Sequence, residues 1–141
     1  MLAVARSLPA WFNEGGLQEM TQDFAVHRSG VAVADGQVVG FITWAPSPHT
    51  PEPGLVEVTW LGVRQEMQGQ AVGRRLVAYL EGVCRAEGVH TLQVSTLADS
   101  VEYKPYEATR AFYRAVGFRD FRIDVGFYDG DDRLLLRKPI D

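Results

Sequence analysis

The segment 68–74, Gln-Gly-Gln-Ala-Val-Gly-Arg, has a small residue at every second position and lies between an apolar segment and an amphipathic one. A helix start leaves its first backbone N–H groups unpaired, and the aligned peptide dipoles place partial positive charge there. Phosphate oxygens can therefore be held by main chain alone, provided that no bulky side chain blocks the approach. Gly69, Ala71 and Gly73 keep that approach open, so the run predicts an anion-binding loop.

The spacing of this loop excludes the two commoner phosphate motifs. A Walker loop requires Gly-Lys-Ser/Thr and a dinucleotide fingerprint requires Gly-x-Gly-x-x-Gly, and neither is present. The pattern Gln68-x-x-Ala71-x-Gly73 resembles instead the Arg/Gln-x-x-Gly-x-Gly/Ala pyrophosphate loop of the GNAT family of N-acetyltransferases. A second segment, 106–118, is similar to the late helix of that family, which reads Ala-x-x-Phe-Tyr and ends in Gly-Phe before a strand.

Hydrophobic periodicity and turn residues predict the elements that position this loop. We expect two short helices over 2–24 with a break at 13–16, followed by a hairpin of strands 31–34 and 38–44 and an irregular proline-rich loop. A strand over 55–63, a helix over 74–87 and a strand over 91–97 come next. The late helix starts at Tyr106, and the last expected element is a hairpin of strands 118–125 and 133–138. From Val31 onward this order resembles the GNAT fold, an α+β fold with a mixed, mostly antiparallel sheet flanked by helices. The family's usual opening strand is expected to be missing.

Length and composition predict a single domain over 1–141. A chain of 141 residues with 46% hydrophobic content is typical of one globular domain. The net charge of −4 argues against a nucleic-acid partner, and His27, His49 and His90 have no metal-ligand spacing. Cys84 is alone, no signal peptide is evident and no run of 18 apolar residues occurs, so we expect a cytoplasmic protein without a membrane partner.

The resemblance implies transfer of an acetyl group from acetyl-CoA to a primary amine, by direct attack within a ternary complex. Acetyl-CoA is then the cosubstrate, and the acceptor is a small-molecule or peptide amine. By resemblance, backbone amides at 61–63 would pair with the pantetheine arm and hold the developing oxyanion. The implied cofactor-binding residues are Leu61, Gly62, Val63, Gln68, Gly69, Gln70, Ala71, Val72, Gly73 and Arg74.

A carboxylate is needed to take a proton from the incoming ammonium, directly or through a water. Glu57 interrupts the apolar strand and stands four residues before Leu61, where some family members carry their base. Charged residues are mostly exposed, so Glu57 could equally face solvent at the start of a strand. Both interpretations stay open at this point.

The departing thiolate needs a proton in turn. Tyr113 stands where the resembling family often has a general-acid tyrosine, one residue after Phe112, which we expect to be buried. The alternative is that Tyr113 is a core aromatic whose hydroxyl is satisfied elsewhere.

The acceptor itself is not specified by the sequence. In the resembling family it is gripped by the first two helices and the last hairpin, and here these carry aromatic and acidic residues that would suit a cationic amine. The aromatic and acidic residues are Trp11, Phe12, Glu14, Glu19, Phe127, Tyr128, Asp129, Asp131 and Asp132. The segment Asp129–Asp132 is equally typical of a plain turn.

A non-catalytic acyl-CoA binding or regulatory module on the same fold is the alternative function. Whether the protein is a monomer or a homodimer is left open.

Overall fold

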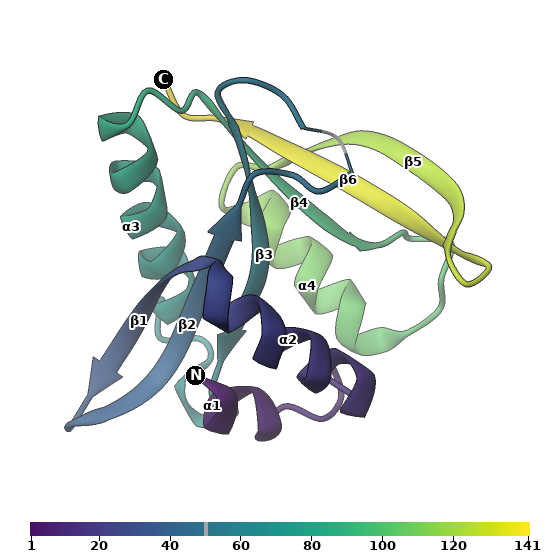
Figure 1. Ribbon diagram of the computed structural model, residues 1–141. Coiled ribbons are helices and arrows are strands. Elements are labelled where there is room, and N and C mark those ends of the chain that lie inside the picture. Colours follow the sequence, from purple (N-terminus) through teal and green to yellow (C-terminus); the bar gives the residue numbers. More distant parts are fainter. Residues whose placement is uncertain (50) are drawn as a thin grey trace.

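The computed structural model describes residues 1–49 and 51–141, in which helices flank a sheet (Figure 1). The strands form one mixed sheet in the order β1-β2-β3-β4-β6-β5. Within the described residues, β3 and β4 are parallel and the other neighbouring pairs are antiparallel. The elements are α1 Leu2–Arg6, α2 Glu14–Val26, β1 Arg28–Ala34, β2 Gln37–Ala45, β3 Leu55–Val63, the 3-10 helix η1 Gln65–Met67, α3 Val72–Ala86, β4 Thr91–Leu97, α4 Lys104–Ala115, β5 Arg119–Tyr128 and β6 Asp131–Pro139.

Two apolar cores lie on opposite faces of the sheet. The larger core joins α3 and α4 to the sheet through residues such as Leu80, Tyr113 and Leu136. The smaller core packs α1 and α2 against β2 around Met20 and Phe41. Burying one face of each amphipathic helix stabilises the fold and fixes where the helix ends lie relative to the strands.

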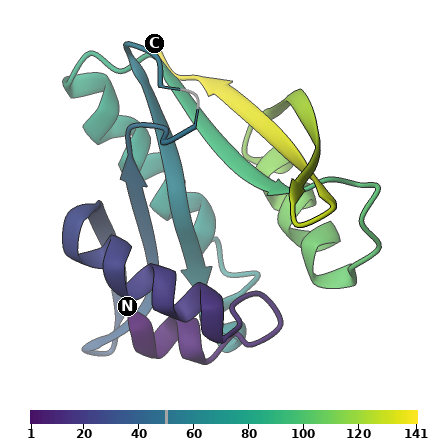
Figure 2. The same ribbon diagram turned by 45° about the vertical axis from the view of Figure 1, so that its right-hand side comes forward.

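Strands β3 and β4 pair over only part of their length. Their ladder runs from Leu55↔Thr91 to Val58↔Val94, after which β3 pairs only with β2 and β4 only with β6. Figure 2 shows the two strands diverging beyond this point. The divergence leaves one backbone edge of the last β3 residues without a strand partner.

A β-bulge marks the place where β3 leaves β4. Thr43 pairs with Trp60 and the next β2 residue pairs with Val58, so Thr59 is an extra residue. The Thr59 hydroxyl lies 2.7 Å from that of Thr43, and the Trp60 indole donates to Asp23 on α2 over 2.8 Å. Both bulge side chains thus lie on the face of the sheet that carries α2. The bulge bends β3 and changes the direction of its remaining residues.

The expected elements are present, with strands 55–63 and 91–97 at the expected bounds. The break near the N-terminus was misplaced, because Gly15 and Gly16 lie inside α2 rather than before it. Asn13 caps that helix by accepting a hydrogen bond from the Gly16 amide over 2.8 Å, so the break falls at 7–13. The described chain enters the sheet through two helices, without an earlier strand. None of its described helices is long and apolar enough to cross a membrane.

Candidate active site

The loop between η1 and α3 has a backbone suited to anion binding. Ala71 precedes the helix in the left-handed region, with φ +64°, and its side chain makes no capping hydrogen bond. The N–H groups of the first turn therefore have no side-chain acceptor at the cap. Gly69 has φ +80°, and a Cβ at this position would meet no atom within 4 Å. The loop leaves its amides open, as the small-residue pattern predicts.

A cavity of ≈ 490 Å³ connects this loop to the diverging part of the sheet. It is bounded by the end of β3, the loop and start of α3, one side of α4, and the segment that joins α1 to α2. Of the ten implied cofactor residues, all but Gln70 line it; the Gln70 amide donates instead to the Glu66 carbonyl over 3.2 Å. The lining residues are Leu8, Trp11, Phe12, Leu61, Gly62, Val63, Met67, Gln68, Gly69, Ala71, Val72, Gly73, Arg74, Ala108, Thr109, Phe112 and Tyr113.

The end of β3 presents main chain to the cavity. Residues 61–63 pair with β2 on one edge and have no β4 partner on the other. Gly62 is fixed as glycine by packing, since a Cβ there would lie 2.7 Å from the Phe41 ring. The Gln68 side chain donates to the Val63 carbonyl over 3.1 Å, which ties the loop to the strand.

Tyr113 forms part of the cavity wall and is also buried, with 8% of its surface exposed. Its ring packs edge-on against Phe112 and Phe118, each at 5.5 Å between centroids. Burial raises the pKa of the Tyr113 phenol well above its ordinary value. Phe112 is only half-buried and lines the cavity, so the expectation that it is the buried member of the pair was wrong.

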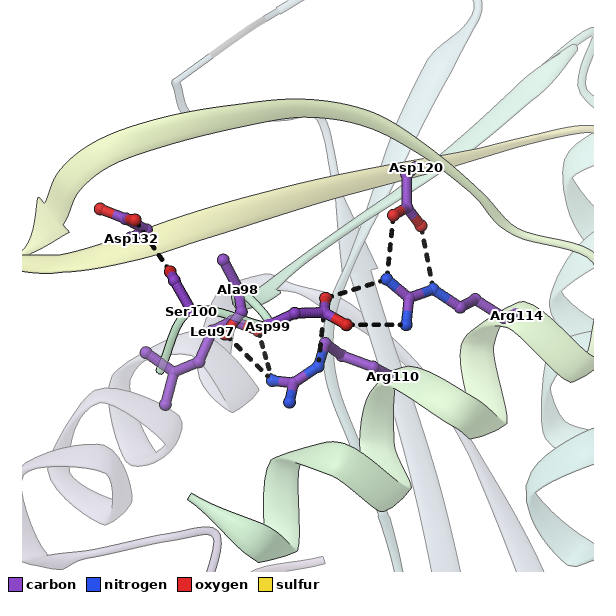
Figure 3. Close-up of polar contacts among 8 residues, drawn as sticks. All are labelled: Leu97, Ala98, Asp99, Ser100, Arg110, Arg114, Asp120 and Asp132. Atoms are coloured by element: carbon purple, nitrogen blue, oxygen red, sulfur yellow. Dashed lines mark hydrogen bonds and ion pairs between the residues drawn. The ribbon is translucent and has the colours of Figure 1, made fainter. Parts of the chain in front are cut away.

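A network of arginines and aspartates holds α4, and with it Tyr113, against the end of β4. The Arg110 guanidinium is buried and donates to the backbone carbonyls at 97–98 over 2.8 and 3.3 Å. Asp99 lies between Arg110 and Arg114, and Arg114 also binds Asp120 (Figure 3). The hydrogen bond from Arg114 lowers the pKa of the Asp99 carboxyl, so the Asp99 carboxylate stays charged at neutral pH and keeps its ion pairs with both arginines.

Glu57 lies outside the residues that line the cavity. It does not face solvent, because only 7% of it is exposed. Its Oε1 accepts hydrogen bonds from the Gln93 amide over 2.8 Å and the Ser47 hydroxyl over 3.2 Å. Gln93 is its register partner on β4, at the part of the sheet where the two strands are still paired.

The segment joining α1 to α2, residues 7–13, carries the cavity residues that sequence reasoning placed differently. Leu8 was not considered, and Trp11 and Phe12 were assigned to acceptor binding and not placed beside the loop before α3. Met67, Ala108 and Thr109 were also missed. The hairpin residues Asp129–Asp132 do not line the cavity. No local motif marks the joining segment, because its position depends on long-range contacts with α4.

No group of three or more His, Cys, Asp or Glu side chains that could hold a metal occurs among residues 1–49 and 51–141. Cys84 is buried on the apolar side of α3, and burial raises the pKa of its thiol. A thiol in that state is not activated as a nucleophile.

The open loop at the start of α3 thus lies beside the place where the parallel strands β3 and β4 diverge. Residues 3–118 match the acetyltransferase (GNAT) family, and the chain belongs to that family. No curated protein matches the chain.

Solved structures share the fold. A GNAT-family protein from Desulfovibrio desulfuricans is 24% identical with a TM-score of 0.84, covering 99% of this chain and 90% of that one. The IAA acetyltransferase from Bacillus cereus is 20% identical with a TM-score of 0.74, covering 95% and 91%. A GNAT acetyltransferase from Elizabethkingia anophelis with acetyl-CoA bound is 16% identical with a TM-score of 0.73, covering 89% and 84%.

Proposed function

We propose that the protein transfers an acetyl group from acetyl-CoA to a primary amine, by direct attack of the amine within a ternary complex. The observation that carries this proposal is the continuous cavity from the loop before α3, past the free edge of β3, to Tyr113. Membership of the acetyltransferase family and the acetyl-CoA bound to the Elizabethkingia neighbour support it.

The residues present fit coenzyme A. Gly69, Ala71 and Gly73 leave the amides at the start of α3 accessible, and Arg74 adds a positive charge to the cavity wall. These groups would hold the pyrophosphate by hydrogen bonds and by the helix dipole. When bound, acetyl-CoA supplies an activated acyl group on a thiol leaving group.

The free backbone edge at 61–63 would serve two purposes. An extended pantetheine arm can pair with it as an added strand would. The same amides can donate to the acyl oxygen as it gains negative charge, and donors fixed in a strand need no reorganisation at that moment. The bulge at Thr59 contributes by separating this edge from β4.

Proton transfer is assigned to two side chains. The Tyr113 phenol is protonated at neutral pH, and burial raises its pKa further, so it can donate to the departing thiolate. We assign Glu57 as the proton acceptor for the amine. Because it does not line the cavity, the proton must reach it through a water rather than by direct contact.

The test is release of free thiol from acetyl-CoA in the presence of primary amines. Amine-dependent release supports transfer. The competing function, a non-catalytic acyl-CoA binding module, would show saturable acetyl-CoA binding without release for any amine.

A further inference from the structure

The segment 7–13, here termed the strap, crosses from the α1–α2 side of the cavity to α4. The Trp11 indole N–H is shared between the Pro105 carbonyl and the Thr109 hydroxyl, each at 3.1 Å. The Tyr103 hydroxyl donates to the Ala10 carbonyl over 2.6 Å. These bonds hold the strap against the start of α4, whose position beside the N-terminal helices is visible in Figures 1 and 2.

The strap is fixed from both of its sides. The Tyr106 hydroxyl donates to the Trp11 carbonyl over 3.2 Å. Phe12 packs edge-on against Trp60, with ring centroids 6.0 Å apart, and the Trp60 indole is itself bonded to Asp23. The aromatic side chains of the strap are therefore held in place before any ligand binds. Because these side chains lose little conformational entropy on binding, they favour a ligand whose shape fits the cavity wall.

The wall that the strap contributes is apolar. Leu8, Trp11 and Phe12 line the cavity, and Arg74, in the first turn of α3, is the one charged residue among those lining it in the described part of the chain. No carboxylate from residues 1–49 or 51–141 lines it. A polycation placed here would lose its hydration without gaining an opposite charge, which is unfavourable.

We propose that the acceptor is a primary amine carried on an uncharged, apolar skeleton about the size of an aromatic ring, bound against Trp11 and Phe12. This deepens the proposed acetyltransferase function and rests on it. The apolar wall also favours the neutral form of the amine, because desolvation penalises the ammonium. Binding and deprotonation are thus promoted by the same side chains.

The first experiment compares amines that share one reacting group. Initial rates of thiol release are measured with 2-phenylethylamine, ethylamine, spermidine and kanamycin at saturating acetyl-CoA. The ring of 2-phenylethylamine should raise kcat/KM over ethylamine by about ten- to a hundredfold, as expected for burying a ring of that size. Equal values for these two amines, or higher values for spermidine or kanamycin, would overturn the proposed acceptor class while leaving acetyl transfer intact.

The second experiment locates the preference on the strap. Trp11→Ala should reduce kcat/KM for 2-phenylethylamine at least about tenfold more than it reduces kcat/KM for ethylamine, so the ratio between the two amines falls. Phe127→Ala, an aromatic truncation on the β5–β6 hairpin outside the cavity lining, is the matched control and should leave the ratio unchanged. If Trp11→Ala fails to fold, Phe12→Leu tests the same wall with a smaller change.

A binding measurement tests the acceptor preference separately from acetyl transfer, because it does not require turnover. With coenzyme A present, 2-phenylethylamine should raise the unfolding temperature more than spermidine does at equal concentration. That result without thiol release from any amine would contradict the acetyltransferase function and keep the ligand preference. A larger shift with spermidine would refute the ligand preference whether or not turnover occurs.

Discussion

The ring of Phe112 on α4 lies directly against Gly73 at the start of α3. A Cβ built at Gly73 would be 3.0 Å from two carbons of that ring. Only a residue without a side chain lets the ring and the helix start approach this closely. Both residues line the cavity, so the contact sets the width of the cavity where the start of α3 meets α4.

Gly73→Val should abolish the stabilisation of the protein by acetyl-CoA. The new side chain would block the approach to the loop amides and push the Phe112 ring out of place. A ligand that binds only the folded state raises its stability by mass action, so the unfolding temperature with and without acetyl-CoA measures the loss. Gly82→Val on the same helix is the control, because a Cβ at Gly82 meets nothing within 4 Å. An undiminished shift in the Gly73 variant would mean that the pyrophosphate lies elsewhere.

Ala71→Gly should stabilise the protein. Ala71 has φ +64°, a conformation that costs an L-residue roughly 1–2 kcal/mol and glycine almost nothing. After the greater flexibility of glycine in the unfolded chain is subtracted, we expect a gain of about 0.5–1 kcal/mol in urea unfolding. Ala78→Gly, an exposed position within α3, should instead lose about 1 kcal/mol. Destabilisation by both changes would show that the left-handed backbone at 71 carries no strain.

The sequence predicted the order of helices and strands along the chain and the open small-residue loop before α3, because both depend on local patterns. The strand at 55–63, the small residues of the loop and the amphipathic stripe of α3 can each be recognised within a short window. The capping role of Asn13 is also a local signal, but the neighbouring glycines were interpreted as a break.

The parts that could not be predicted depend on contacts between distant segments. Trp11 reaches the cavity through bonds to residues more than 90 positions away. Glu57 is buried by Gln93 and Ser47, which approach it from β4 and from the loop after β2. Periodicity along one strand cannot tell a solvent-facing carboxylate from one covered by another segment.

Tyr113→Phe should lower the turnover number while leaving acetyl-CoA affinity unchanged. The substitution keeps the ring contacts with Phe112 and Phe118 and removes one hydroxyl. Loss of a general acid reduces the rate on the order of 10²-fold or more. Steady-state kinetics checks the split between kcat and KM, with Tyr79→Phe on the exposed side of α3 as the control. Wild-type turnover would assign Tyr113 to packing alone.

The same variant tests the effect of burial on the phenol. Burial raises the pKa of Tyr113 above the ordinary 10.0, so the native state keeps a proton that the unfolded chain loses. The stabilising contribution is complete below about pH 10 and is lost as the pH rises through the native pKa. Unfolding free energy should therefore fall more steeply above pH 10 in the wild type than in Tyr113→Phe. Equal slopes in urea titrations would contradict this.

Glu57→Gln should lower turnover at neutral pH and regain part of it as the pH approaches the pKa of the acceptor amine. Glutamine keeps the shape and one acceptor oxygen for Gln93 and Ser47, but it cannot take a proton. At higher pH more of the amine arrives neutral, so the base matters less. Glu81→Gln is the matched control, since Glu81 is a buried glutamate on α3 that pairs with Lys138 away from the cavity lining. It should lose stability without changing the shape of the pH–rate profile. A loss in Glu57→Gln that is the same at every pH would assign Glu57 a structural role, and an unchanged rate would leave proton removal to water.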